Sequence, residues 1–186
     1  MMDTAALKMW ATGRIPSARL AHCSRVAQLA QWLAQRYDVD PDKARLAGFL
    51  HDCARDESPA RLLELAGLWR IPVTEVEARA PILLHAPVGA ELVRRECGVE
   101  DIQILDAIRF HTTGRSGMSP LEKIVFVADY AEPARDFPGV ERVRAAMFEC
   151  LDTAVRLALD QSLRYLLERG YLVHPNMVAA RNALYM

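Results

Sequence analysis

The sequence predicts an all-α protein, and two features support that prediction. Apolar residues recur at helical spacing along most of the 186 residues, whereas the alternating pattern of a half-buried strand is scarce. Capping residues also stand directly before prolines, as is typical of helix starts, at Asp40-Pro41, Ser58-Pro59 and Ser119-Pro120. A chain of this length can bury the core of one domain, so we expect a single helical bundle over residues 1–186.

Capping residues and glycines place the elements in order along the chain. Asp101 can cap one helix, Ser119 and Glu122 have the spacing of a capping box, and Gly170 suits the end of a long helix. The expected helices cover residues 2–12, 17–37, 41–54, 59–69, 74–80, 86–97, 102–111, 120–132, 141–149, 152–169 and 175–184.

Composition limits the classes of function. Lys plus Arg number 23 and Asp plus Glu 24, giving a net charge of −1, so a broad surface for nucleic acid is not expected. The N-terminus lacks the pattern of a signal peptide, and no apolar run is long enough for a membrane span. The four cysteines form no C-x-x-C pair, and we expect reduced thiols, mostly in the core, of a cytoplasmic protein.

Four of the five histidines fall on apolar faces of the expected helices. His22 shares a stripe with Val26, Leu29 and Leu33, at helical spacing. His51 follows small residues on its own face, which would let another helix approach closely. His85 and His111 also begin or end apolar stripes. His174, before Pro175, has no such pattern and is expected to be a capping or surface residue.

Two carboxylates accompany these histidines. Asp52 follows His51 directly, and Asp129 lies in the middle of the apolar stripe of the helix at 120–132. A single inward histidine is more often a hydrogen-bonded core residue than a ligand. An unpaired buried carboxylate is costly, however, and a metal cluster would satisfy all six side chains at once. Imidazole with carboxylate suits zinc, iron or manganese.

The order His22, His51-Asp52 and Asp129 resembles the HD superfamily of metal-dependent phosphohydrolases. Further stretches, which run to the C-terminal helix, make the chain similar to the YqeK family within it. They are AGFLHDCARD at 47–56, LHAPVGA at 84–90, AIRFHTTG at 107–114, ADYAEPAR at 128–135 and ARN at 180–182.

This resemblance implies an enzyme that splits diadenosine tetraphosphate symmetrically to two ADP, with a two-metal centre of the di-iron type in a helical bundle. It implies that one metal is held by His22, His51, Asp52 and Asp129, and the second by His85 and His111, with Asp52 bridging. The metal-site core would span about 17–132, and further helices about 141–184. Two such ions can neutralise phosphoryl oxygens and activate a water molecule.

Candidates for substrate contacts are less specific. Arg55, one turn beyond His51, could contact a phosphate and assist catalysis, although many HD proteins carry a lysine there. Thr112 and Thr113 could donate hydrogen bonds, and Arg135 and Arg181 are further candidates. The sequence has neither a P-loop nor a dinucleotide-binding glycine motif.

Three other readings remain open from the sequence. The chain could be an HD nucleotidase or dNTP phosphohydrolase with the same metal site and a different pocket. It could be a non-catalytic nucleotide-binding HD module, although such modules usually lose ligands. It could also be a helical protein whose inward histidines pair with one another. For the oligomeric state, a homodimer is one option.

Overall fold

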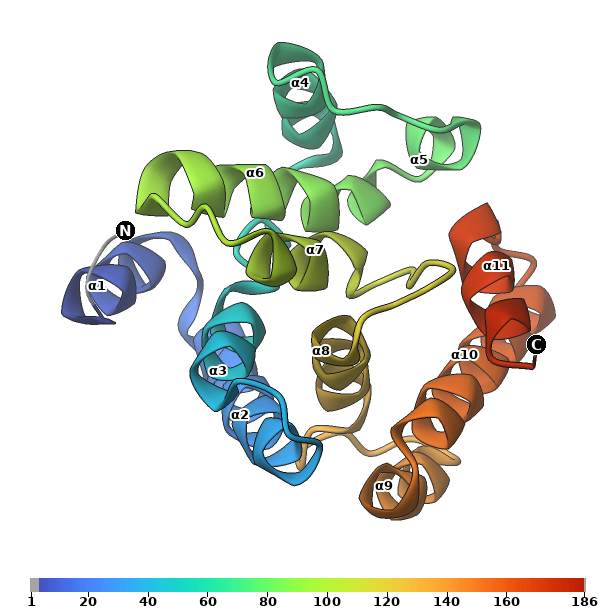
Figure 1. Ribbon diagram of the computed structural model, residues 1–186. Coiled ribbons are helices and arrows are strands. Elements are labelled where there is room, and N and C mark those ends of the chain that lie inside the picture. The colour runs from blue at the N-terminus through green and yellow to red at the C-terminus, as the bar shows by residue number, and fades with distance from the viewer. Residues whose placement is uncertain (1–3, 186) are drawn as a thin grey trace.

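The computed structural model describes residues 4–185, and its described part is all-α, as predicted (Figure 1). One short 3-10 helix, η1 (Pro81–Leu84), accompanies eleven α-helices. These are α1 (Thr4–Arg14), α2 (Ser17–Arg36), α3 (Pro41–Leu50), α4 (Pro59–Leu68), α5 (Glu75–Arg79), α6 (His85–Cys97), α7 (Ile102–Phe110), α8 (Pro120–Ala131), α9 (Val140–Glu149), α10 (Leu151–Glu168) and α11 (Pro175–Ala183).

The helix starts follow the predicted caps. The Asp40 carboxylate accepts hydrogen bonds from the backbone N–H groups of Asp42 and Lys43. Ser119 and Glu122 close the predicted capping box at the start of α8. These side chains satisfy N–H groups that lack a partner within the first helical turn.

Helix α8 lies between the α2–α3 pair and the α9–α10 pair, with α6 and α7 above it in Figure 1. Its buried face is almost entirely apolar, and it contributes Val125, Val127 and Ala128 to the main core. Because α8 packs against both α2 and α3, a side chain on its inward face reaches the junction of these helices.

Helices α2 and α3 approach closely at Gly48. A Cβ atom at this position would lie 3.1 Å from the Cα atom of Ala27 and 3.3 Å from the Cβ atom of Ala30. The small residues before His51 therefore do what the sequence predicted and admit the backbone of a neighbouring helix. This packing brings the rings of His22 and His51 to a centroid distance of 5.3 Å.

The structure differs from the predicted elements mainly around the His-Asp pair. Helix α3 ends at Leu50 rather than at residue 54, and turns with hydrogen bonds three residues apart follow it. His51 and Asp52 thus stand at a helix end, where the chain can aim adjacent side chains at one centre. Helix η1 was not predicted, and the predicted start of the first helix at residues 2–3 lies outside the described residues.

Cys23, Cys53 and Cys97 are buried, whereas Cys150 is exposed at the junction of α9 and α10, contrary to a core role for that residue. All four are free thiols. Within residues 4–185, no helix combines the length and the apolar character that crossing a membrane requires.

Candidate metal centre

Six side chains from five parts of the bundle converge on one buried centre. His22 comes from α2, His51 and Asp52 from the end of α3, His85 from the first residue of α6, His111 from the residue after α7, and Asp129 from α8. His51, Asp52, His85 and His111 are at most 6% exposed. These are the six residues that the sequence proposed as ligands.

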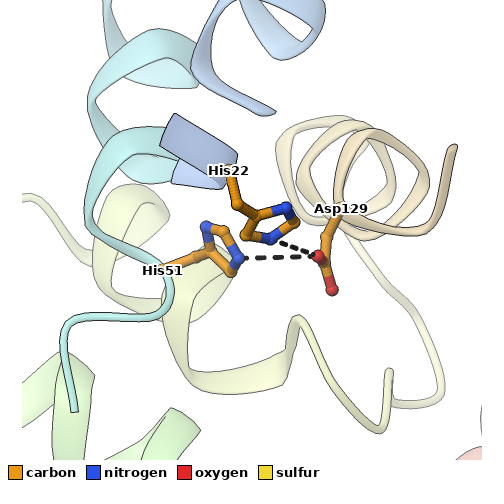
Figure 2. Close-up of side chains that lie close together, drawn as sticks. All are labelled: His22, His51 and Asp129. Carbon is orange, nitrogen blue, oxygen red and sulfur yellow. Dashed lines mark ion pairs between the residues drawn. The ribbon is translucent and has the colours of Figure 1, made fainter. Parts of the chain in front are cut away.

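Asp129 joins two of the histidines at one end of the centre (Figure 2). Its Oδ1 atom lies 3.0 Å from Nε2 of His22 and 3.6 Å from Nε2 of His51. The three potential ligand atoms are close enough to share one metal ion.

Asp52 lies close to the histidines at the other end of the centre. Its Oδ1 atom lies 3.3 Å from Nε2 of His85 and 3.5 Å from Nε2 of His111, while its Oδ2 atom lies 3.7 Å from Nε2 of His51. The side chain of Asp52 therefore lies between the two ends, the position that a bridging carboxylate needs.

Three of the histidines donate a hydrogen bond through Nδ1 and present Nε2 to the centre. Nδ1 of His51 donates to the carbonyl oxygen of Gly48 at 2.8 Å, and Nδ1 of His111 donates to that of Ile108 at 2.7 Å. Nδ1 of His85 donates to a carbonyl oxygen of η1 in the same way. Because a carbonyl oxygen only accepts, the proton of each neutral ring lies on Nδ1, and the lone pair of Nε2 points into the centre.

His22 follows this pattern with a different acceptor. Its Nδ1 atom faces Oε1 of Glu132 at 3.1 Å, and Glu132 is 2% exposed. Burial alone would raise the pKa of Glu132, but hydrogen bonds from Arg25, the backbone N–H of Ala134 and His22 lower it to about 2. The acceptor behind His22 is therefore a carboxylate anion.

The donor set fits a cation. Nε2 of His22 and Nε2 of His51 are buried and lack a hydrogen-bond partner among the described residues. Nε2 of His85 and Nε2 of His111 lie 3.2 Å apart, with both Nδ1 atoms bound to carbonyl oxygens. Lone pairs that face one another or a carboxylate in a buried site are unfavourable unless a proton or a metal ion lies between them.

Burial and the facing carboxylates act in opposite directions on the histidines of the centre. Burial disfavours a charged His51, but the carboxylates of Asp52 and Asp129 raise its pKa to about 9. For His85, burial is the largest effect, and its pKa is lowered. Burial opposes the charge of Asp52 and Asp129 too, yet the surrounding histidines lower the pKa of both carboxyl groups. The two carboxylates thus favour a positive charge at this end of the centre, whether it is carried by a proton or by a metal ion.

Two arginines approach the carboxylates from outside. Arg19 donates to Oδ2 of Asp52 at 2.8 Å and also binds Asp56. Arg135 donates to Oδ1 of Asp129 at 2.9 Å. The sequence had indicated that Asp129 needs a cation, and Arg135 supplies one from the loop after α8.

Sequence reasoning missed Arg19 and Glu132. Arg19 lies one helical turn before His22, so its spacing was the available signal. Glu132 had no comparable local signal, because its contact with His22 depends on how α8 packs against α2.

The proposed substrate residues lie at different places. Thr112 is at the centre, with Oγ1 3.0 Å from Nε2 of His111 and 3.3 Å from Nε2 of His85. Thr113 is buried and donates its hydroxyl to the carbonyl of Gly114.

Arg55 is half-buried, and its guanidinium makes no hydrogen bond or ion pair within residues 4–185. Arg181 binds Asp160 and contacts none of the six clustered residues.

A pocket of about 440 Å³ adjoins the helix ends that carry His85 and His111. Its lining includes Ala86 and Phe110, the chain neighbours of those histidines, together with Trp69 and Thr113. His174 also lines it and is 4% exposed. The sequence predicted that His174 is a capping or a surface residue. It caps α11, and it is buried rather than on the surface.

A helical bundle with a buried centre of histidines and aspartates is the arrangement of HD domain proteins. Residues 19–134 match the HD domain family. The chain is 42% identical to a symmetrical bis(5'-nucleosyl)-tetraphosphatase of Halalkalibacterium halodurans, covering 89% of this chain and 88% of that protein. It is 39% identical to the protein of the same name from Bacillus subtilis, covering 89% of each.

A solved structure shows the same fold. It is a predicted HD superfamily hydrolase involved in NAD metabolism from Clostridium acetobutylicum, with a TM-score of 0.97 and 34% identity over 100% of this chain and 98% of that one. The chain therefore belongs to the HD domain proteins and, among them, to the symmetrical bis(5'-nucleosyl)-tetraphosphatase family.

Proposed function

We propose that this protein hydrolyses diadenosine tetraphosphate symmetrically to two ADP at the buried metal centre. The observation that supports the proposal most strongly is the convergence of all six ligand side chains, with every Nε2 atom aimed inward, in a chain 42% identical to an enzyme named for this reaction. Core histidines that bind no metal would not need two aspartates and a pair of facing Nε2 atoms.

The residues that would hold metal fall into two overlapping sets. His22, His51 and Asp129 form one, His85 and His111 the other, and Asp52 would bridge them. Nitrogen and oxygen donors of this kind suit iron, manganese or zinc, and iron is our proposal for the native metal. The bound ions would neutralise phosphoryl oxygens and make a water molecule a better nucleophile at neutral pH.

In the proposed reaction, the oxygen of water bonds to one of the two central phosphorus atoms. The bond from that phosphorus to the central bridging oxygen breaks, and ADP leaves with this oxygen. The second ADP carries the oxygen of water. Phosphoryl transfer of this type depends mainly on positioning and charge, so cationic side chains beside the centre are the residues to examine.

Three arginines would meet the phosphate chain in this proposal. Arg19 and Arg135 already contact the ligand carboxylates, and they can turn to phosphate oxygens when those carboxylates bind metal. Arg55 is half-buried and without an ionic partner among residues 4–185, so its charge is available. The hydroxyl of Thr112 lies at the centre and could donate to a phosphoryl oxygen. Arg181 is the weakest candidate because Asp160 holds it.

The adjoining pocket has a size suited to a nucleoside arm of the substrate. Ligand sites of small molecules are usually a few hundred Å³ and combine aromatic walls with a few polar groups. Here Trp69 and Phe110 supply the aromatic groups, and Glu77 and His174 supply buried polar ones. A nucleoside in this pocket would leave the phosphates directed to His85 and His111.

The test is product analysis with the purified protein. Diadenosine tetraphosphate is incubated with added iron or manganese, or with chelator, and the products are separated by chromatography. We expect ADP alone, with loss of turnover in chelator and in Asp52→Ala. ATP plus AMP would contradict symmetric cleavage. Bound metal without turnover would reject the substrate and direct the test to mononucleotides, as for an HD nucleotidase.

A further inference from the structure

The contact between His22 and Glu132 distinguishes one end of the centre from the other. Glu132 accepts four hydrogen bonds from three residues: Arg25 donates to Oε2 at 2.6 Å and to Oε1 at 3.2 Å, the N–H of Ala134 donates at 2.8 Å, and Nδ1–H of His22 donates at 3.1 Å. With 2% exposure, the carboxylate has little access to water. Its position is thus determined by the protein.

The other three histidines lack such a group. His51, His85 and His111 each donate Nδ1–H to a backbone carbonyl oxygen three residues earlier in the chain. A carboxylate is a stronger acceptor than a neutral carbonyl, because the hydrogen bond is charge-assisted. Among the four rings, His22 is therefore the one whose Nε2 lone pair gains most electron density from its outer partner.

A carboxylate behind a metal-binding imidazole both orients the ring and raises the basicity of its free nitrogen. We infer that Glu132 is a positioning residue that makes the end formed by His22, His51 and Asp129 the tighter of the two metal sites, so that this end fills first. The inference rests on the metal centre of the proposed function but does not depend on which phosphate substrate is cleaved.

The chain offers a matched control for this inference. Glu122, at the other end of α8, is also 2% exposed and also binds an arginine through both oxygens, with Arg115 in the place of Arg25. Glu122 contacts no histidine of the centre. Glu132 is the residue that follows the last turn of α8, so Glu122→Gln and Glu132→Gln each remove a buried, arginine-paired carboxylate from one end of α8. The two variants differ in the contact with His22.

The experiment is a titration of the full-length, metal-free protein with Co²⁺. Calorimetry gives the two dissociation constants, and the visible spectrum of Co²⁺ reports the ligand field at each step. We expect two separable steps in the wild type and in Glu122→Gln. In Glu132→Gln we expect the first step to weaken about 10–100-fold with a shifted spectrum, and the second step to change little.

Equal effects of the two glutamine variants on both steps would overturn the inference, as would an unchanged first step in Glu132→Gln. If Glu132→Gln does not fold, Arg25→Gln replaces it, because that variant keeps the carboxylate but loosens its anchoring. We then expect a smaller weakening of the first step alone, and no weakening would count against the inference. Stepwise Co²⁺ binding that depends on Glu132, in a protein that leaves diadenosine tetraphosphate intact, would reject the proposed substrate and keep this inference.

Discussion

Nε2 of His85 lies 3.2 Å from Nε2 of His111, although both rings have their Nδ1 protons committed to backbone carbonyl oxygens. Each Nε2 atom therefore presents its lone pair to the other unless a cation lies between them. A bound metal ion converts this repulsion into coordination, so metal should stabilise the folded protein strongly.

We expect metal to raise the melting temperature of the metal-free protein. At a free metal concentration of 100 times Kd, one site adds about 2.7 kcal/mol. For a protein of this size, that corresponds to a rise of roughly 5–11 °C. Scanning calorimetry with and without Mn²⁺ measures it, and His111→Ala should reduce the rise. A melting temperature indifferent to metal and chelator would indicate that the histidines serve the core alone.

Asp52→Asn should abolish most of the turnover. The substitution keeps the shape of the side chain but removes the charge that lies between the two ends of the centre. Because metal activation contributes several kcal/mol to such reactions, we expect kcat to fall about a thousandfold or more. Asp152→Asn, at an exposed aspartate that binds Lys123, is the control and should retain activity. Comparable activity of the two variants would exclude a bridging role for Asp52.

Arg19→Gln tests the proposed phosphate contact. A hydrogen bond to a charged group is worth about 1.5–3 kcal/mol, so kcat/KM should fall roughly 10–150-fold. The fall should appear mainly in KM if Arg19 binds the phosphates in the ground state. Arg61→Gln removes an arginine of a surface pair with Glu64 and should leave both constants unchanged. Identical kinetics of Arg19→Gln and the wild type would remove Arg19 from the site.

Glu122 should contribute stability that depends on pH. Burial would raise its pKa, but Arg115 and Ser119 lower it below the usual value. A carboxyl group with a lowered folded pKa stabilises the protein above its unfolded pKa, near 4.3, and loses this contribution as pH falls through the folded value. We expect Glu122→Gln to cost about 1–3 kcal/mol at pH 7 and less at pH 4, by urea unfolding. An equal cost at both pH values would contradict the pairing.

The close contact of α2 and α3 predicts the effect of Gly48→Ala. Alanine favours helices over glycine by about 1 kcal/mol, but its Cβ atom would meet the backbone of Ala27 at 3.1 Å. Overpacking of this kind costs about 1–3 kcal/mol, so we expect a net loss of stability and weaker metal binding, because His22 and His51 would separate. Gly67→Ala, with no atom within 4 Å of the new methyl group, should not destabilise the protein. Urea unfolding that showed Gly67→Ala to be less stable than Gly48→Ala would refute this expectation.

Much of the fold followed from local signals in the sequence. The caps at Asp40, Ser58 and Ser119 fixed helix starts, because each side chain binds N–H groups two or three residues away. The end of α3 at Leu50 could not be predicted in this way. No glycine or proline marks it, and the turns after it depend on packing against other helices.

The site was predictable where polar residues interrupted apolar stripes. His22 and Asp129 stood out for this reason, and the structure places their side chains 3.0 Å apart. Arg19 and Glu132 did not stand out, because charged residues on helix flanks or ends are usually solvated. The spacing of Arg19 from His22 was a local signal, but the contacts that give Arg19 and Glu132 their roles span 33 and 110 residues of sequence.

Hydrolysis of diadenosine tetraphosphate in ¹⁸O-labelled water, followed by mass spectrometry of the products, tests the central claim most directly. We expect ADP as the sole nucleotide product, with one ¹⁸O atom in the terminal phosphate of one ADP from each substrate molecule, and no product after metal removal. Labelled ATP or AMP, or ADP formation that persists with chelator and with Asp52→Ala, would contradict symmetric hydrolysis at this metal centre.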